Sequence, residues 1–302
     1  MKKYIVLYLI STLVISCAQE TPNESREQST LTTVKPKKFH DHLCDKKNNN
    51  LNISILVDLS DRISYNNQIE KDTANLNTIA NTFINHIAHK KSMTLEDRIQ
   101  LFFEPNPKSG KINEIARQLS IVINKHSQKE QERDIKRIYN NLPIKLYNAA
   151  LDDDTTNKGA DLWGFFKNKV KEYCIEECHR NILIILTDGY LYYEGGIAQQ
   201  NSKTTYINKK LLSRPEMKKA NWKEIIRKKK MGILKATDNL QDLEVLVLGI
   251  DSHNYKNPYA KSILKHFWED WFQEMGIEHY KIKNADIPNS IGKTIQKFIM
   301  DY

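Results

Sequence analysis

The chain has 302 residues, of which 46 are Lys or Arg and 37 are Asp or Glu, and its formal net charge is +9. With 40% hydrophobic residues, this composition excludes a chain that is disordered throughout, a collagen and a coiled coil. Four cysteines are too few for a disulfide scaffold, and a basic excess by itself indicates solubility rather than a nucleic-acid partner.

The N-terminal segment has the pattern of an export signal. Lys2 and Lys3 precede an apolar run from Tyr4 to Ile15, which is too short to span a bilayer comfortably. The end of the run, Val14-Ile15-Ser16-Cys17, resembles a bacterial lipobox. A plain signal peptide or a short N-terminal anchor is the competing interpretation.

The lipobox resemblance implies that residues 1–16 are a lipoprotein signal peptide and that Cys17 is acylated after cleavage. Acyl chains would then hold the protein on a membrane of the bacterial cell envelope. Ala18 is not a retention signal of the Asp type, which favours the outer membrane over the inner one. Residues 18–50 are rich in polar side chains and have little to bury, so we expect residues 17–50 to be a lipidated cysteine and a flexible tether.

The remaining chain, residues 51–302, alternates predicted strands and helices. Apolar, β-branched runs predict strands at Asn52–Val57, Arg98–Phe103, Asn181–Thr187, Leu243–Ile250 and Ile277–Ile282. Helical spacing predicts helices over residues 67–90, 112–141 (in two pieces), 159–177, 258–275 and 288–300. Leu119–Ile123 could instead be an edge strand.

This alternation predicts a three-layer α/β fold of Rossmann-like type, with a mainly parallel central sheet flanked by helices. The interval of residues 190–242 is longer than a simple crossover needs, so we expect an enlarged insertion there.

Polar clusters occur where ligands collect in such folds, beyond the carboxyl ends of the strands. Asp58 and Ser60 follow the first strand, Thr187-Asp188-Gly189 ends the central one, and residues 155–159 open the helix between them. Carboxylate and hydroxyl oxygens suit a hard cation such as Mg²⁺ or Ca²⁺. Taken singly, each cluster is equally typical of a helix cap or a turn.

Together, these clusters resemble the metal-ion-dependent adhesion site of a von Willebrand factor A-type (vWA) domain. Asp58 and Ser60 match the first two positions of the family motif D-x-S-x-S. Thr156 begins a match to T-x-x-G-x-x-L, and Asp188 matches T-D-G. The resemblance covers roughly residues 50–300 and implies that Asp58, Ser60, Thr156 and Asp188 bind Mg²⁺ or another divalent cation.

The third position of the first motif is Arg62, where the family has a serine. Arg62 could point outward, leaving a weaker metal site that Asp61 or water supplements, or it could neutralise Asp58 and Asp188 without a metal. We expect Arg62, Tyr190, Tyr192 and Tyr193 to contact a partner, because tyrosine supplies rigid contact area with a polar tip. Packing of one or two tyrosines in the core is the alternative.

Cys44 and Cys178 each precede a predicted strand, and vWA-type neighbours would bring them to one edge of the sheet. A disulfide between them is plausible in an exported protein, and Cys44 with Cys174 is the competing pair. A zinc site is a further alternative, from His40, His42, Cys44, Cys174, Cys178 and His179.

The sequence favours a membrane-tethered binding module and not an enzyme. Its partner would be an envelope or surface protein whose carboxylate completes the coordination of the cation. The basic run Arg227–Lys230 lacks the interleaved aromatic residues of a nucleic-acid platform, so no nucleic-acid partner is expected. A metal-free envelope scaffold, or a Mg²⁺-dependent hydrolase that uses Asp58, are the alternatives.

Overall fold

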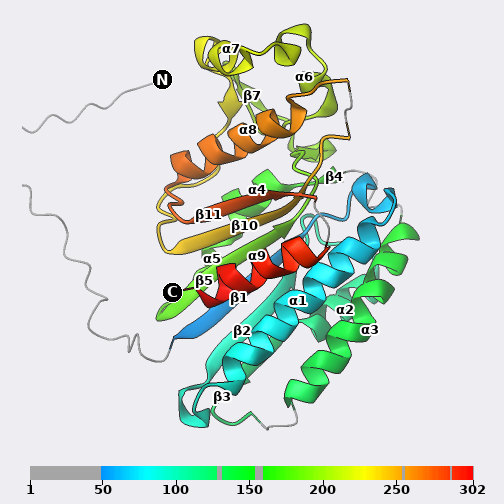
Figure 1. Cartoon of the computed structure of the whole chain (residues 1–302), viewed down its shortest axis with the longest axis vertical. Coiled ribbons are helices and arrows are strands. Elements are labelled where there is room, and N and C mark those ends of the chain that lie inside the picture. Colours follow the sequence, from blue (N-terminus) through cyan, green and yellow to red (C-terminus); the bar gives the residue numbers. More distant parts are fainter. Residues whose placement is uncertain (1–48, 128–130, 154–158, 254–255, 286–287, 302) are drawn as a thin grey trace, which may run out of the picture. The chain divides into compact units, whose positions relative to one another are not determined.

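A computed structural model of the chain describes residues 49–127, 131–153, 159–253, 256–285 and 288–301. Six of its strands form a central sheet in the order β11-β10-β5-β1-β2-β3 (Figure 1). These strands are β1 (Asn50–Val57), β2 (Glu96–Phe102), β3 (Ile121–Asn124), β5 (His179–Leu186), β10 (Leu243–Ile250) and β11 (Tyr280–Asn284). Neighbouring strands are parallel except at the edge, where β3 runs antiparallel to β2.

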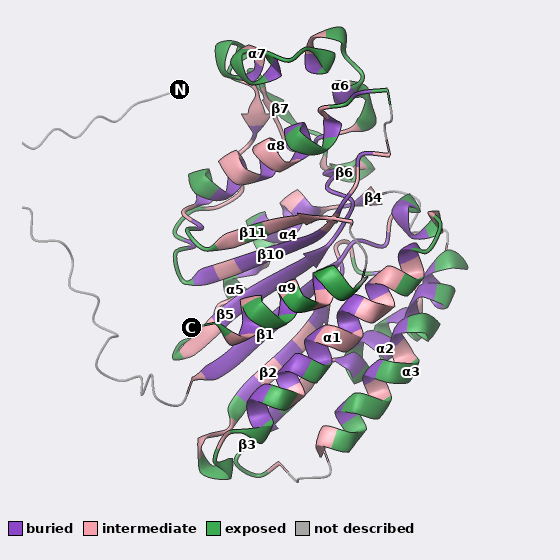
Figure 2. Ribbon diagram, viewed as in Figure 1, coloured by how far each residue is buried: buried purple, intermediate pink, exposed green. Residues whose placement is uncertain are grey.

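Side-chain burial follows the position of each strand in the sheet. All eight residues of β1 are buried, and so are the last six of β5, because helices cover both faces there (Figure 2). In β2, by contrast, buried side chains alternate with less buried ones, as expected beside the edge of a sheet.

One face of the sheet packs against α1 (Gln68–Ala88), α2 (Gly110–Leu119), α3 (Gln131–Leu151) and α9 (Pro288–Met300). The other face packs against α4 (Leu162–Asn168), α5 (Val170–Cys174) and α8 (Ala260–Met275). Alternate residues of β1 divide between the two cores: Ile55 belongs to the first and Leu56 to the second. The expected three-layer α/β fold with a mainly parallel sheet is therefore confirmed.

The strand order reverses between β1 and β5. From β1 the chain builds outward to β2 and β3 on one side, and then to β5, β10 and β11 on the other. Such a reversal is a topological switch point, and ligands of open α/β sheets bind beyond the carboxyl ends of the strands at this place. Asp58 follows β1 and Asp188 follows β5 closely, so both flank the switch point.

The interval of residues 190–242 forms short elements beside α8. They are β6 (Tyr192–Tyr193), β7 (Gln199–Gln200), β8 (Lys203–Thr204), α6 (Lys209–Leu212), α7 (Trp222–Lys229) and β9 (Gly232–Ile233). Strands β7, β8 and β9 make a small separate sheet, while β6 pairs with β4 (Gly159–Ala160). Buried Leu212, Met217, Trp222 and Ile226 join these elements to the second core.

The structure also corrects some predicted elements. The edge strand considered near residue 121 exists as β3, and it separates α2 from α3. The predicted helix over residues 159–177 is shorter, because residues 159–160 pair with β6 before α4 begins. The last strand begins at Tyr280, three residues later than predicted. Among the described residues, no helix is long and apolar enough to cross a bilayer.

Candidate functional site

Asp58 and Asp188, called here the aspartate pair, lie at the carboxyl ends of two adjacent strands. The pairing of β1 with β5 runs to Val57 and Leu186, and the Asp58 N–H extends it by donating to the Leu186 carbonyl at 3.0 Å. Both side chains are almost fully buried, with 2% of Asp58 and 6% of Asp188 exposed.

The Asp58 carboxylate is held by two hydrogen bonds. The backbone N–H of Ser60 donates to Oδ1 at 2.9 Å, and the Thr187 hydroxyl donates to Oδ2 at 2.8 Å. Thr187, which follows β5, thus connects three strand ends. Its hydroxyl bonds Asp58 after β1, and its own N–H donates to the Leu248 carbonyl in β10. These bonds fix the carboxylate in place before any ligand arrives.

Asp188 is positioned by the turn that follows β5. The Tyr190 N–H donates to its Oδ1 at 3.2 Å, and its backbone carbonyl accepts from the Asp251 N–H at 2.9 Å. The turn needs glycine at position 189, where φ is +96° and a Cβ atom would lie 2.6 Å from the Ile250 side chain. The Gly189 carbonyl accepts a hydrogen bond from the Trp268 indole N–H, which anchors the turn to α8.

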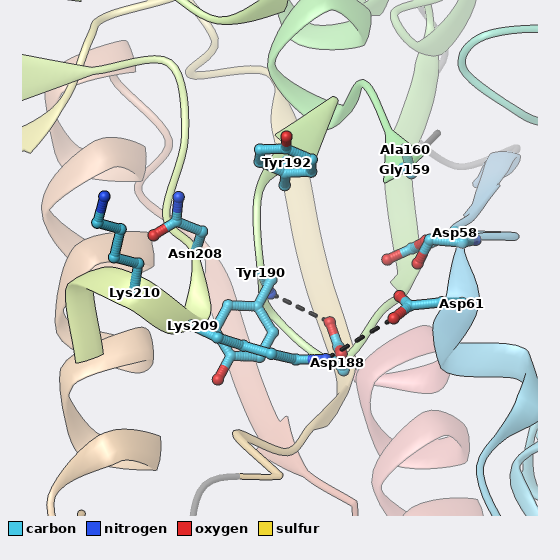
Figure 3. Close-up of a pocket in the computed structure, with 11 residues that line it drawn as sticks. Asp58, Asp61, Gly159, Ala160, Asp188, Tyr190, Tyr192, Asn208, Lys209 and Lys210 are labelled. Carbon is cyan, nitrogen blue, oxygen red and sulfur yellow. Dashed lines mark hydrogen bonds and ion pairs between the residues drawn. The ribbon is translucent and has the colours of Figure 1, made fainter. Parts of the chain in front are cut away.

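A cavity of about 350 Å³, called here the first cavity, opens above the aspartate pair (Figure 3). Asp58, Ser60, Asp61 and Asp188 line it on the sheet side, so three carboxylates and a serine face one space. Its other walls come from β4, from the segment after β5 and from the insertion: Gly159, Ala160, Tyr190, Tyr192, Asn208, Lys209 and Lys210.

Arg62 lies beneath this cavity rather than in it. Its side chain is fully buried, and its Nη1 donates to the backbone carbonyl of Asp58 at 2.8 Å. Its two terminal nitrogens also donate hydrogen bonds to the carboxylate of Asp72 in α1, at 2.8 and 3.1 Å. Arg62 therefore neither points outward nor bonds the two carboxylates of the aspartate pair. Since a partner cannot reach it in this conformation, Arg62 is not part of the exposed surface.

Asp72 is one of two residues near the site that the sequence patterns did not identify. Besides Arg62, it accepts hydrogen bonds from the Gln68 amide at 2.9 Å and from the Tyr147 hydroxyl at 2.9 Å. Despite burial, which alone would lower it, the pKa of Arg62 lies above its ordinary value because of Asp72 and then Asp58. Asp72 lies four residues after Gln68, where α1 begins, and this position in a helix does not by itself indicate a buried ion pair.

The electrostatics of the aspartate pair follow from this arrangement. Burial, and after it the nearby Asp58 carboxylate, raises the pKa of Asp188 to about 7, while Arg62 acts in the opposite direction. The charge of Arg62 is already matched by Asp72. The ion pair beneath the Asp58 and Asp188 carboxylates is therefore neutral as a whole. The first cavity is therefore short of positive charge at its floor.

Lys209 extends from the insertion across the first cavity, and its ammonium supplies positive charge beside Asp61. Its ammonium hydrogen-bonds the Tyr65 hydroxyl at 2.8 Å and lies 3.7 Å from an oxygen of Asp61 (Figure 3). It also lies 5.9 Å from the ring centre of Tyr190. Sequence reasoning did not identify Lys209, since 144 residues separate it from Tyr65 and only the insertion brings it here.

Thr156 lies outside the described residues, but the end of its motif lies at the first cavity. Gly159 pairs with Tyr193 and Ala160 with Tyr192, and both Gly159 and Ala160 line the cavity. A Cβ atom on Gly159, whose φ is +91°, would lie 2.1 Å from the Tyr192 carbonyl oxygen. The glycine is thus required by close contact with β6.

The three tyrosines after the aspartate pair differ in their surroundings. Tyr190 is mostly buried and its hydroxyl donates to the Ser252 carbonyl at 2.5 Å, so part of its role is structural. Tyr192 is 41% exposed and, like Tyr190, lines the first cavity. Tyr193 is half-buried and is not among the residues lining that cavity.

Cys174 and Cys178 lie at the opposite edge of the sheet, close to the start of β5. Cys178 is disulfide-bonded and Cys174 is buried and free, which removes the competing pair of Cys44 with Cys174. Cys44, like Cys17, lies outside the described residues, so the pair of Cys44 with Cys178 stays a prediction. Burial raises the pKa of the Cys174 thiol to about 12, so it is unreactive.

The residues proposed for a zinc site are only in part described. His40 and His42 lie outside the described residues, and both ring nitrogens of His179 lie within 2.8 Å of backbone carbonyl oxygens. In the described part of the chain, no group of three or more His, Cys, Asp and Glu side chains is arranged to hold a metal ion. The aspartate pair contributes two carboxylates, which is fewer than the three side chains of such a group.

No protein family matches the chain, and no curated protein is similar to it in sequence.

Proposed function

We propose that this chain is a vWA-like binding module, tethered to the bacterial envelope, that holds a divalent cation between Asp58 and Asp188 and uses it to bind a carboxylate of a protein partner. The observation that carries the proposal is the charge arrangement at the switch point. Two buried carboxylates face an open cavity, while the nearby Arg62 is matched by Asp72.

The donor set suits a hard cation. Asp58, Asp188 and Ser60 offer oxygen atoms, which Mg²⁺ and Ca²⁺ prefer. Buried carboxylates need a compensating charge, and a metal ion is one of the usual sources. We propose Asp58, Ser60 and Asp188 as ligands, with Thr156 as a fourth.

When bound, the cation would supply an electrophilic position at the floor of the first cavity. Asp58, Ser60 and Asp188 supply fewer oxygen ligands than the about six or more that Mg²⁺ and Ca²⁺ take, so a bound ion would keep an open position for a carboxylate of the partner. Tyr192, exposed at the rim, offers contact area for the polypeptide that brings this ligand. This arrangement supports binding rather than turnover.

Calorimetric titration of MgCl₂ and MnCl₂ into the full chain, purified in detergent, tests the cation directly. The wild type should show saturable binding that Asp58→Asn and Asp188→Asn abolish. Asp251→Asn is the matched control, because Asp251 follows the neighbouring strand β10 but does not line the first cavity.

Equal affinity of the wild type and both aspartate-pair variants, with the fold intact by circular dichroism, would remove the metal-bridged function. The metal-free scaffold would then be the better account. Phosphatase turnover that Asp58→Asn abolishes would instead support the hydrolase.

The membrane tether has its own test, since it depends on Cys17. Cells grown with radioactive palmitate should label the wild-type chain and leave Cys17→Ser unlabelled. Label on both chains would contradict acylation at Cys17 while leaving the cation proposal standing.

A further inference from the structure

A second cavity, of about 490 Å³, lies within the insertion. Its floor is apolar, with Ile207, Leu211 and Phe267 among its residues, and its rim is polar. The described residues that line it include the cations Lys210, Arg214 and Lys229 and no acidic side chain. The second cavity is therefore an electropositive cleft with an apolar base.

The two cavities are neighbours along the surface. Asn208 and Lys210 line both of them, and Asn208 caps α6 by accepting a hydrogen bond from the Leu211 N–H at 3.0 Å. In Figure 3 the side chains of Asn208 and Lys210 extend upward from the insertion, and neither points toward Asp58 or Asp188. A ligand longer than a single side chain can thus extend from the first cavity into the second.

The cations of the second cavity differ in how far they are neutralised. Lys229 forms an ion pair with Glu216 at 3.1 Å. None of the ion pairs within the described residues includes Lys210 or Arg214, although the charge of Arg214 acts on Glu216 together with that of Lys229. Lys210 and Arg214 are both exposed, so their charges remain available to a ligand.

We propose that the two cavities form one groove that binds an acidic segment of a partner protein, with Lys210 and Arg214 pairing with its carboxylates. The inference rests on the proposed function at one end, where a first carboxylate of the segment would meet the cation at the aspartate pair. At the other end it rests on the charge and the lining of the second cavity, independently of the cation.

A polypeptide fits this groove better than an isolated anionic group. The apolar floor can hold aliphatic parts of side chains, while the Ser202 hydroxyl and the Asn201 amide can bond a peptide backbone. In addition, Gln199 belongs to β7, an edge strand that pairs with β8 on one side. Edge strands and side-chain clefts are recurring means of peptide recognition.

Fluorescence anisotropy of labelled decaglutamate with the full chain tests the groove, in Mg²⁺ and separately in EDTA. The double variant Lys210→Gln/Arg214→Gln should weaken binding about tenfold, because two charge-assisted contacts are lost. Lys218→Gln/Lys219→Gln is the matched control. It makes the same charge change on exposed residues of the same insertion that line neither cavity, and should leave the affinity within about twofold.

The two buffers separate this inference from the proposed function. In EDTA the uncompensated aspartates repel the peptide, so binding should weaken, yet it should still depend on Lys210 and Arg214. Binding that depends on these two residues but not on Mg²⁺ would remove the cation bridge and leave the groove.

Three outcomes would overturn the groove itself: no binding of decaglutamate, no effect of the double variant, or an equal effect of the control pair. Polyphosphate of similar charge serves as the competing probe. If it displaces decaglutamate at lower concentration through the same two residues, the second cavity is a phosphate site and not a peptide site.

Discussion

Arg62 departs from the D-x-S-x-S motif, yet its side chain does not fill the first cavity above the aspartate pair. It replaces the serine of the resembled motif, but a turn of 3-10 helix at Asp61–Ser64 directs its side chain under β1. There it joins the Asp58 backbone to Asp72 in α1. Its guanidinium bonds the Asp72 carboxylate and the Asp58 backbone, and it acts on the aspartate-pair carboxylates only through its charge.

Replacing Arg62 should therefore destabilise the fold. Arg62→Met leaves the Asp72 carboxylate buried without its cation, and we expect the free energy of unfolding to fall by about 3 kcal/mol. Urea denaturation measures this loss. Arg117→Met is the control, since Arg117 pairs with Glu114 on the exposed surface and its loss should leave stability nearly unchanged. A loss for Arg62→Met as small as the control's would contradict the account.

At the scale of elements, the short pair of β4 and β6 holds Gly159 and Ala160 against the segment after β5. Gly159→Ala would place a methyl group against the Tyr192 carbonyl and force φ from its positive value. We expect a loss of about 1–3 kcal/mol in stability and weaker Mg²⁺ binding in the same calorimetric titration. Gly110→Ala, where a Cβ atom meets nothing within 4 Å, should leave both unchanged. Unaltered Mg²⁺ affinity in Gly159→Ala would show that β4 has no part in cation binding.

Asp97 joins three elements at the amino edge of the sheet. From β2, it accepts hydrogen bonds from the Leu51 N–H in β1 at 2.7 Å, from His86 in α1 at 3.1 Å and from Lys90 at 2.6 Å. Burial alone would raise the pKa of Asp97, but the bonds from His86, Lys90 and Leu51 hold it below its usual 3.8.

The folded protein therefore favours ionised Asp97 more than the unfolded chain does. This stabilisation is complete above the unfolded pKa and is lost as the pH falls through the lower folded value. Asp97→Asn should lower the free energy of unfolding by about 3 kcal/mol near neutral pH. The difference from the wild type should shrink below about pH 4. Denaturation curves from pH 3 to 7 measure it, and a difference that grows toward low pH would contradict this linkage.

At the scale of the whole molecule, the sequence predicts the features that its apolar runs determine, namely the central sheet and the ends of its strands. The buried runs of β1, β5 and β10 predict a mainly parallel sheet, and the polar residues directly after them predict where Asp58 and Asp188 meet. Residues that tertiary packing brings to the site from elsewhere gave no such pattern. Lys209 and Lys210 belong to the insertion, and Asp72 lies within an ordinary amphipathic helix.

The same reason explains the errors in the predicted elements. Strand β3 has four residues and two of them are exposed, so its pattern is too short to distinguish from the helix before it. Its existence depends on pairing with β2, which a local pattern cannot reveal.

The most direct test of the central claim is the anomalous scattering of Mn²⁺ in crystals of this protein grown with millimolar MnCl₂. A cation at this site should give a peak bounded by the carboxylates of Asp58 and Asp188, present in the wild type and absent from Asp188→Asn. Crystals in which the first cavity is open to solvent but no such peak appears would contradict a cation at the aspartate pair.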